Sequence, residues 1–395
     1  MHMDANSAPP FTSSPSEASL IRGGPFYRAQ QKARLIRPNQ WNFARRITFL
    51  IAVGWLPLPL ITAILNPAGL VSLMRDFRVH SRMLVGVPVL LLGELLMESN
   101  FRTVFKHIRQ AGLLEAADLK RMDGVIATLI RARDSFLPEL AILVLLIVHS
   151  ATSFKGVVDA TPWLSHDSGA DLHLTAAGWY AAVVSASIWQ FLLGVGLWKW
   201  LLWTFFAFEL SRRDLKLVAT HPDGQGGLGF LGFTTAAFAP IAFAVATVIA
   251  STWRHEILHD GARLANFKLP GMALIAIIAL VALGPLIFFV PRLAALRRRG
   301  ILEYGILEQV HGTKFHEKWI VHRAGHEAEL LEAPESIALF ASGQTFDRVQ
   351  QLKPFPADRG SLVALSLAVV VPALPLIFTQ VPLAFVLKIL LKALR

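Results

Sequence analysis

Long apolar runs recur along this chain of 395 residues, and several are long enough to cross a lipid bilayer. Each run is continuous rather than alternating, which indicates helices and not the strands of a membrane barrel. The sequence therefore predicts an all-α fold, a polytopic transmembrane helical bundle of about seven spans. We expect the first six spans near 47–65, 83–98, 136–156, 178–208, 229–251 and 271–290, and the last from residue 361.

Composition agrees with a surface that faces lipid. Charged residues make up 16% of the chain, against roughly a quarter in a typical soluble domain. Hydrophobic residues make up 54%. Cysteine is absent, which excludes a disulfide framework, a thiolate metal site and a thiol redox motif.

The net charge of +11 reflects the placement of Lys and Arg around the spans. On the side of the N-terminus the expected segments between spans carry 27 of these residues, and those on the other side carry 6. Basic residues accumulate on the cytoplasmic side, so we expect a cytoplasmic N-terminus. The basic flanks 22–46 and 297–299 fit anionic lipid headgroups. No aromatic-interleaved basic module indicates nucleic-acid binding.

The expected organisation has four parts. Residues 1–46 are predicted to form a disordered, basic cytoplasmic tail, and 47–290 the bundle, including an amphipathic cytoplasmic segment at 99–135. Residues 291–360 are predicted to be a mostly helical cytoplasmic section. Residues 361–395 should hold the last span and an amphipathic C-terminal helix. A cytoplasmic section of this size could contact a protein partner or a second copy of the chain.

A glycine-rich turn stands near the middle of the chain, reading HPDGQGGLGFLG at 221–232. One interpretation is a tight turn followed by close helix packing, since glycines let backbones approach. The other is an anion site at a helix N-terminus. Neither a Walker loop nor a dinucleotide fingerprint fits, because no Lys-Ser/Thr follows and no strand precedes. The candidate ligand residues are His221, Asp223, Gly226, Gly227 and Gly229.

This turn resembles the signature of a large set of uncharacterised bacterial inner-membrane proteins. Similar matches are EYG at 303–305, after the sixth span, and TQVPL at 379–383. The resemblance covers most of the chain from about residue 45. It implies a bacterial source and a multi-pass fold, and it implies neither an activity nor any site residue.

A second motif, HEILH at 255–259, matches the H-E-x-x-H pattern of zinc hydrolases. On a helix, His255 and His259 lie one turn apart and can share a zinc ion, while Glu256 would activate bound water. Asp76 and His80 are candidate further ligands on the same side of the membrane. The alternative is a set of polar residues at the membrane surface, and the sequence alone commits to no cofactor.

Glu94 lies inside the second expected span, where a charged carboxylate costs about 2.5–3.5 kcal/mol. It must be paired, protonated or facing a polar cavity. Gln190 and Lys199 lie on the fourth span. Gln190 can bond a neighbouring helix, and Lys199, between two tryptophans, is predicted to reach toward the cytoplasmic interface.

Three classes of function remain open. The leading hypothesis is a transport or channel-like protein with a polar path near Glu94, which predicts a polar cavity there. The second is a membrane metallohydrolase that uses HEILH, which predicts a third ligand beside the two histidines. The third is a non-catalytic scaffold that docks a cytoplasmic partner, which predicts a dry bundle and an exposed apolar patch on the cytoplasmic layer.

Overall fold

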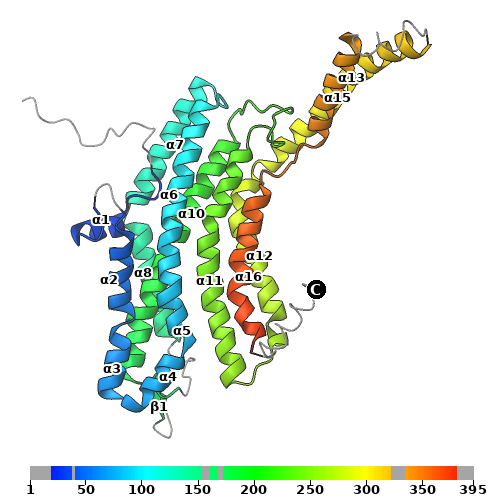
Figure 1. Ribbon diagram of the computed structural model, residues 1–395. Helices are drawn as coiled ribbons and strands as arrows, with labels where there is room; N and C mark the ends of the chain where they lie inside the picture. Colours follow the sequence, from blue (N-terminus) through cyan, green and yellow to red (C-terminus); the bar gives the residue numbers. More distant parts are fainter. Residues whose placement is uncertain (1–18, 38–40, 154–160, 168–171, 322–333, 380–395) are drawn as a thin grey trace, which may run out of the picture.

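The computed structural model describes residues 19–37, 41–153, 161–167, 172–321 and 334–379. Within these ranges almost all regular structure is helical, which confirms the all-α prediction. Two three-residue strands, β1 (Ser165–Asp167) and β2 (Leu172–Leu174), pair antiparallel, with His166 opposite His173. Figure 1 shows the long helices running side by side as a bundle, with one helical pair projecting away from it.

Six helical segments of the described residues are long and apolar enough to cross a membrane. They are Phe43–Leu65 (α2 Phe43–Gly54, α3 Pro57–Leu65), Phe77–Gln110 (α5 Phe77–His80, α6 Val87–Gln110), Ala176–Ser211 (α9 Ala176–Tyr180, α10 Ala186–Ser211), Gly229–His259 (α11 Gly232–His259), Leu264–Ile287 (α12 Lys268–Ile287) and Arg359–Ile377 (α16). The remaining expected span, 136–156, corresponds to α8 (Leu137–Ser153). Its apolar part, Leu137–His149, is shorter than a full span.

Shorter elements connect these segments. Two π-helical turns, Ser81–Gly86 and Ala181–Ser185, join α5 to α6 and α9 to α10. Outside the candidate spans lie α1 (Pro25–Lys32), α4 (Leu70–Arg75), α7 (Ala116–Asp134), α13 (Val290–Phe315) and α15 (Pro334–Gln350). The expected amphipathic C-terminal helix falls largely on 380–395, outside the described residues.

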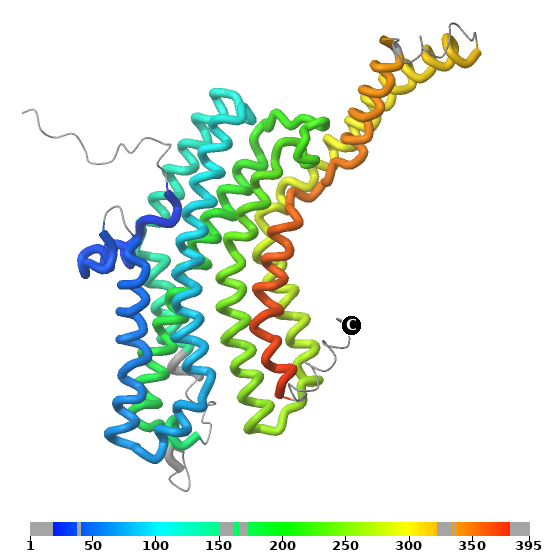
Figure 2. The backbone as a smooth tube through the Cα atoms, in the orientation of Figure 1, coloured from blue at the N-terminus to red at the C-terminus, as the bar shows by residue number. Residues whose placement is uncertain are grey.

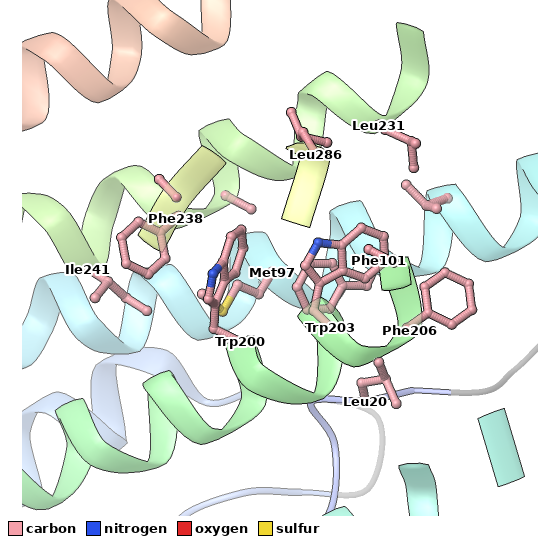
Figure 3. Packing of buried hydrophobic residues seen from close by; sticks show 14 of the residues in the cluster. Leu20, Met97, Phe101, Trp200, Trp203, Phe206, Leu231, Phe238, Ile241 and Leu286 are labelled. Atoms are coloured by element: carbon pink, nitrogen blue, oxygen red, sulfur yellow. The ribbon is translucent and has the colours of Figure 1, made fainter. Parts of the chain in front are cut away.

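An aromatic core joins α6, α10 and α11. Phe101 stacks on Trp203 with ring centroids 4.4 Å apart, and Trp200 meets Phe238 at 4.8 Å. Figure 3 shows these rings packed together with Leu231 and Leu286 from neighbouring segments. Aromatic pairs of this kind stabilise beyond the area they bury. The core therefore fixes the register of α6 against α10, and with it the positions of the charged residues one or two turns away.

The segment before the first span differs from the expected disordered tail. Leu20 and Ile21 are fully buried, and α1 follows directly. The backbone N–H of Gly24 donates to Asp134 at 2.9 Å, and that of Phe26 donates to Glu139 at 2.7 Å. The buried side chains of Leu20 and Ile21 and the carboxylates of Asp134 and Glu139 therefore hold this segment against the bundle, although its composition predicts a disordered tail. Residues 1–18 lie outside the described part.

The expected boundary between the second span and the amphipathic segment, at residue 99, also differs from the structure. Residues 99–110 continue the helix of the second span as part of α6 instead of opening a separate amphipathic segment. Glu98 and Arg102 pair across one turn of that helix, and no glycine or proline occurs between Glu94 and Ala111. The amphipathic part is therefore α7, which runs back along α6 in Figure 2.

The projecting helical pair, α13 and α15, is called the arm below. Both helices leave the bundle at the end where α6 and α7 turn, and they contact each other along their length (Figure 1). At their base, the Arg297 guanidinium donates from Nε and Nη2 to the carbonyl oxygen of Gln350, at 3.2 and 3.0 Å. The section predicted to be mostly helical is thus helical over α13, the turn His316–Val321, and α15.

Candidate functional site

Glu94 is paired on both of its carboxylate oxygens. Lys199 Nζ donates to Oε1 and Arg46 Nη2 donates to Oε2, each at 2.6 Å. Arg46 Nε also donates to the side-chain oxygen of Gln30, on α1, at 2.7 Å. The Arg46 and Lys199 side chains are 1% and 6% exposed. Each charge therefore has a partner that offsets the loss of its hydration.

The paired group lies near the boundary of the bundle. Arg46 belongs to the first turn of α2, and the Trp41 ring lies beneath the guanidinium groups of Arg22 and Arg46. One turn further along α6, Glu98 accepts a hydrogen bond from Ser19 and pairs with Arg22. Tryptophan and arginine are typical of the membrane interface. This position favours a structural role for Glu94 near the point where the chain enters the bundle.

Lys199 differs from its prediction. Its ammonium group points inward to Glu94 and is buried, whereas we expected it to reach the cytoplasmic interface. The physical reason is that one intramembrane carboxylate and one intramembrane ammonium neutralise each other at lower cost than either does alone. The sequence contained part of this signal, because Lys199 is the one Lys or Arg within the expected fourth span, 178–208.

The cavity beside Glu94 is small. Its volume is about 20 Å³, room for little more than one water molecule. Apart from Glu94 and Lys199, the side chains that line it are apolar, among them Phe26, Leu192 and Ile241. Gln190, expected on the same path, does not line it and lies about 13 Å before Lys199 along α10. The polar cavity expected for a transport path is thus reduced to a water-sized space.

The central glycine-rich turn is closed by its own carboxylate. Asp223 accepts hydrogen bonds from the backbone N–H groups of Gln225, Gly227 and Gly229, at 2.8, 3.1 and 2.9 Å. Gly227 has a φ of +94°, a left-handed conformation that suits glycine. Two of these donors, Gly227 and Gly229, are residues that we expected to bind an external anion, whereas Gln225 is not. Because Asp223 already occupies them, the geometry does not support the anion-site interpretation.

Hydrogen bonding also sets the ionisation of Asp223. Burial alone would raise the pKa of this carboxyl, but the three backbone donors and the His221 ring outweigh burial and lower the pKa below its ordinary value. His221 Nδ1 lies 2.9 Å from Asp223 Oδ1, and its ring is largely exposed. Asp223 is therefore ionised and acts as an internal cap for the turn.

The turn joins the bundle to the base of the arm. The backbone N–H of Lys353 donates to the Gly224 carbonyl at 2.8 Å, so the chain leaving α15 is held on the turn. A Cβ atom on Gly226 would lie 2.9 Å from Leu296 on α13, and one on Gly232 would lie 2.8 Å from Asp358 Oδ1. The interpretation as a turn with tight packing therefore agrees with the structure.

The HEILH motif occupies the last turn of α11, at the opposite end of the bundle. The His255 and His259 rings stack with centroids 4.3 Å apart. Both line a cavity of about 340 Å³ between α4 and α11, here called the α4–α11 cavity. It is lined by Ala68, Val71, Ser72, Arg75, Asp76, Thr161, His255 and His259. Glu256 is not among these residues.

The expected metal ligands are not brought together. Asp76 is held by the Arg78 guanidinium, at 3.0 and 2.9 Å, and by Trp163 Nε1 at 3.2 Å. His80 accepts from Trp55 Nε1 at 2.9 Å and faces backbone carbonyls with its other nitrogen. Within the described part of the chain, no three His, Asp or Glu side chains are grouped to hold a metal ion. The zinc-hydrolase hypothesis thus lacks its third ligand here.

These features together describe a class: a polytopic helical membrane protein with paired charges at one end of the bundle, an open polar cavity at the other, and a projecting helical arm. A scan against protein-family models and searches of curated proteins and of solved structures each found no match to this chain.

Proposed function

We propose that the protein is a non-catalytic membrane scaffold whose arm docks a protein partner in the cytoplasm. One observation carries this proposal: both helices of the arm expose large apolar side chains. On α13 these include Leu302 and Ile306, which are 70% and 69% exposed. On α15 they include Ile337 and Phe340, which are 63% and 69% exposed.

The apolar residues of α13 form a row. Leu302, Ile306 and Val310 follow each other at four-residue spacing, so they share one face of the helix. The opposite face packs on α15, where Gly305 lies against Phe346. Apolar residues gathered on one exposed face of a soluble segment are typical of an interaction site. This face fits the apolar surface of a partner helix or groove.

Lipid does not account for this face. Arg297, Arg298 and Arg299 lie between the end of α12 and Leu302, and such a basic cluster belongs outside the hydrocarbon layer. Three turns of α13 beyond the cluster, Val310 lies about 17 Å further along the helix than Arg299. Water therefore surrounds the row unless a protein covers it.

The bundle supports the same proposal. A transport path near Glu94 requires a polar cavity, and the space found there holds about one water molecule. A scaffold requires a dry bundle, which agrees with the paired charges of Glu94 and with the aromatic core. The transport hypothesis remains a prediction, and neither the cavity beside Glu94 nor the ion pairs of Glu94 favour it.

The location of the partner follows from charge. The arm and the N-terminus lie on the side of the bundle that carries most of the Lys and Arg residues. We therefore propose that the arm lies in the cytoplasm. The resemblance of the glycine-rich turn to that of bacterial inner-membrane proteins supports a bacterial inner membrane as the location of the bundle. Anionic headgroups of that membrane are the expected contacts of the basic residues at the base of the arm.

Site-specific photo-crosslinking in native membranes tests the proposal. A photoreactive amino acid replaces Ile306 or Phe340 in the full chain, and Lys120, an exposed residue of α7 outside the arm, provides the control. We expect one discrete protein adduct from positions 306 and 340 and none from 120. Mass spectrometry of the adduct identifies the partner.

Each other outcome contradicts the proposal in its own way. Equal adducts at all three positions would indicate unspecific collisions, and no protein adduct at any position would leave the row uncovered. An adduct at twice the mass of the chain would assign the face to a second copy and replace the hetero-partner with a homo-oligomer.

A further inference from the structure

The wall of the α4–α11 cavity combines one guanidinium group and one carboxylate with several neutral hydrogen-bonding groups. Arg75 from α4 and the two histidines of α11 line it, together with the hydroxyl groups of Ser72 and Thr161. Its single carboxylate is Asp76. The cavity is about 340 Å³, the size of a small-ligand site. The metal hypothesis needs a third ligand beside the two histidines, which the described residues do not bring together, and the scaffold hypothesis requires no cavity.

Asp76 does not neutralise the cavity, because its carboxylate is already committed. Arg78 binds it through two guanidinium nitrogens, and Trp163 donates a third hydrogen bond. Among the described residues, no carboxylate forms an ion pair with Arg75. A guanidinium group that lines a cavity without a carboxylate partner matches the geometry of a phosphate group.

Thr161 adds an unused donor. Its Oγ1 atom is buried and has no hydrogen-bond partner within the described part of the chain. Buried hydroxyl groups are normally paired, so one left without a partner at a cavity wall calls for an explanation. A phosphate oxygen in the cavity would accept this hydrogen bond.

The two histidines complete the donor set. His259 Nδ1 lies 3.2 Å from the carbonyl oxygen of His255 and donates to it, which leaves Nε2 as the nitrogen able to meet a ligand. The stacked rings present two nitrogen groups on the same face of α11.

We propose that the α4–α11 cavity binds a phosphate group through Arg75, His259 and the Thr161 hydroxyl. The cavity lies where α11 leaves its apolar stretch and just before the second candidate span begins. At this level of a bilayer the phosphates of lipid headgroups are close by. The phosphate can therefore belong to an anionic lipid or be free in solution, and the experiment separates these sources.

The test uses the full chain in nanodiscs of phosphatidylcholine, with and without phosphatidylglycerol, and inorganic phosphate as the soluble probe. Binding to the native state raises the thermal unfolding midpoint. We expect Arg75→Gln to weaken binding about tenfold or more, since charge-assisted hydrogen bonds are the strong ones. Thr161→Val should weaken binding several-fold while leaving unliganded stability unchanged or raised, because it removes an unpaired hydroxyl. Arg263→Gln, an exposed arginine at the same end, is the control.

The outcomes are distinct. Protection by inorganic phosphate in phosphatidylcholine discs assigns free phosphate, and protection only by phosphatidylglycerol assigns a lipid headgroup. The proposal is overturned if neither protects, or if Arg75→Gln and Arg263→Gln behave alike. It is also overturned if zinc, but not phosphate, raises the midpoint and loses its effect in His259→Gln.

Discussion

Apolar side chains face outward on both the bundle and the arm, yet their surroundings differ. On the bundle they cover helices such as α12 and α16, which are long enough to cross a bilayer, so lipid tails can cover them. On the arm they lie beyond three consecutive arginines, where water is the solvent. The same kind of residue therefore indicates lipid in one region and a protein partner in the other.

The ion pairs of the two regions also differ, because those of the bundle are shielded from water and those of the arm are exposed. In the bundle, Arg46 and Lys199 are buried, and each pairs at 2.6 Å with Glu94, whose side chain is 15% exposed. On the arm, Arg299 and Glu303 pair at 3.4 Å with side chains that are mostly exposed. Buried pairs are costly to break, whereas exposed pairs contribute little. Stability should thus depend on the charges of the bundle, and association on the apolar face of the arm.

The largest effect is expected from Glu94→Gln. This change leaves two buried cations with a neutral partner, and breaking a buried pair costs about 3–5 kcal/mol. Thermal unfolding in detergent measures the loss, with Glu303→Gln on the arm as the matched control, expected to cost less than about 0.5 kcal/mol.

The double variant Glu94→Gln/Lys199→Met sharpens the test, because it should cost less than the sum of its two single changes if the residues act as a pair. A Glu94→Gln protein as stable as the wild type would show that the pairing does not hold the bundle together.

A smaller effect is expected at the turn that joins the two regions. Asp223→Ala removes the acceptor of three backbone N–H groups, with an expected loss of about 1–3 kcal/mol. Hydrogen exchange should become faster at Gly227, Gly229 and the base of the arm, while the aromatic core stays protected. Uniform loss of protection across the bundle would contradict a local role for the turn.

The pH dependence of the turn follows from the same carboxyl. Its pKa in the folded protein lies below the ordinary value of 3.8, so the ionised form stabilises the turn. This contribution is present above pH 3.8 and is lost as the pH falls through the lower folded pKa. Exchange at Gly227 should therefore accelerate in that acidic window in the wild type, and Asp223→Asn should show no such step.

The smallest effect on stability is expected from Leu302→Ser/Ile306→Ser. Both side chains are about 70% exposed, so their loss should change the unfolding free energy by less than about 0.5 kcal/mol. The adduct formed from position 340 should nevertheless disappear. A large drop in stability would instead indicate that these residues support the arm itself.

The apolar runs were enough to predict the bundle, because a bilayer leaves helices as the stable form of such segments. They could not predict the pairing of Glu94. Arg46 precedes the expected start of the first span at 47, and Lys199 stands between two tryptophans, a pattern that equally fits the interface. Which cation meets a carboxylate depends on helix register, and register is set by packing that involves Phe101 and Trp203.

HEILH and the glycine-rich turn likewise show that local spacing does not determine which residues meet in the fold. HEILH has the local spacing of a zinc site, but the third ligand must come from another part of the chain, and Asp76 is bound by Arg78. In the glycine-rich turn, Gly227 and Gly229 act as backbone donors, but Gln225 is the third donor in place of Gly226, and the acceptor is Asp223 of the same turn. Asp223 reaches them because Gly224, Gly226 and Gly227 adopt positive φ angles, which residue types permit but do not determine.

Cysteine protection in native membranes tests the scaffold account most directly. The chain contains no cysteine, so Ile306→Cys and Lys120→Cys each give a single thiol for a membrane-impermeant maleimide applied to inverted vesicles. We predict that Ile306→Cys is protected in vesicles and becomes reactive once the protein is purified away from its partner, while Lys120→Cys, on α7, reacts in both. Equal labelling of the two positions in vesicles would show that the apolar face of the arm is uncovered, and would contradict the account.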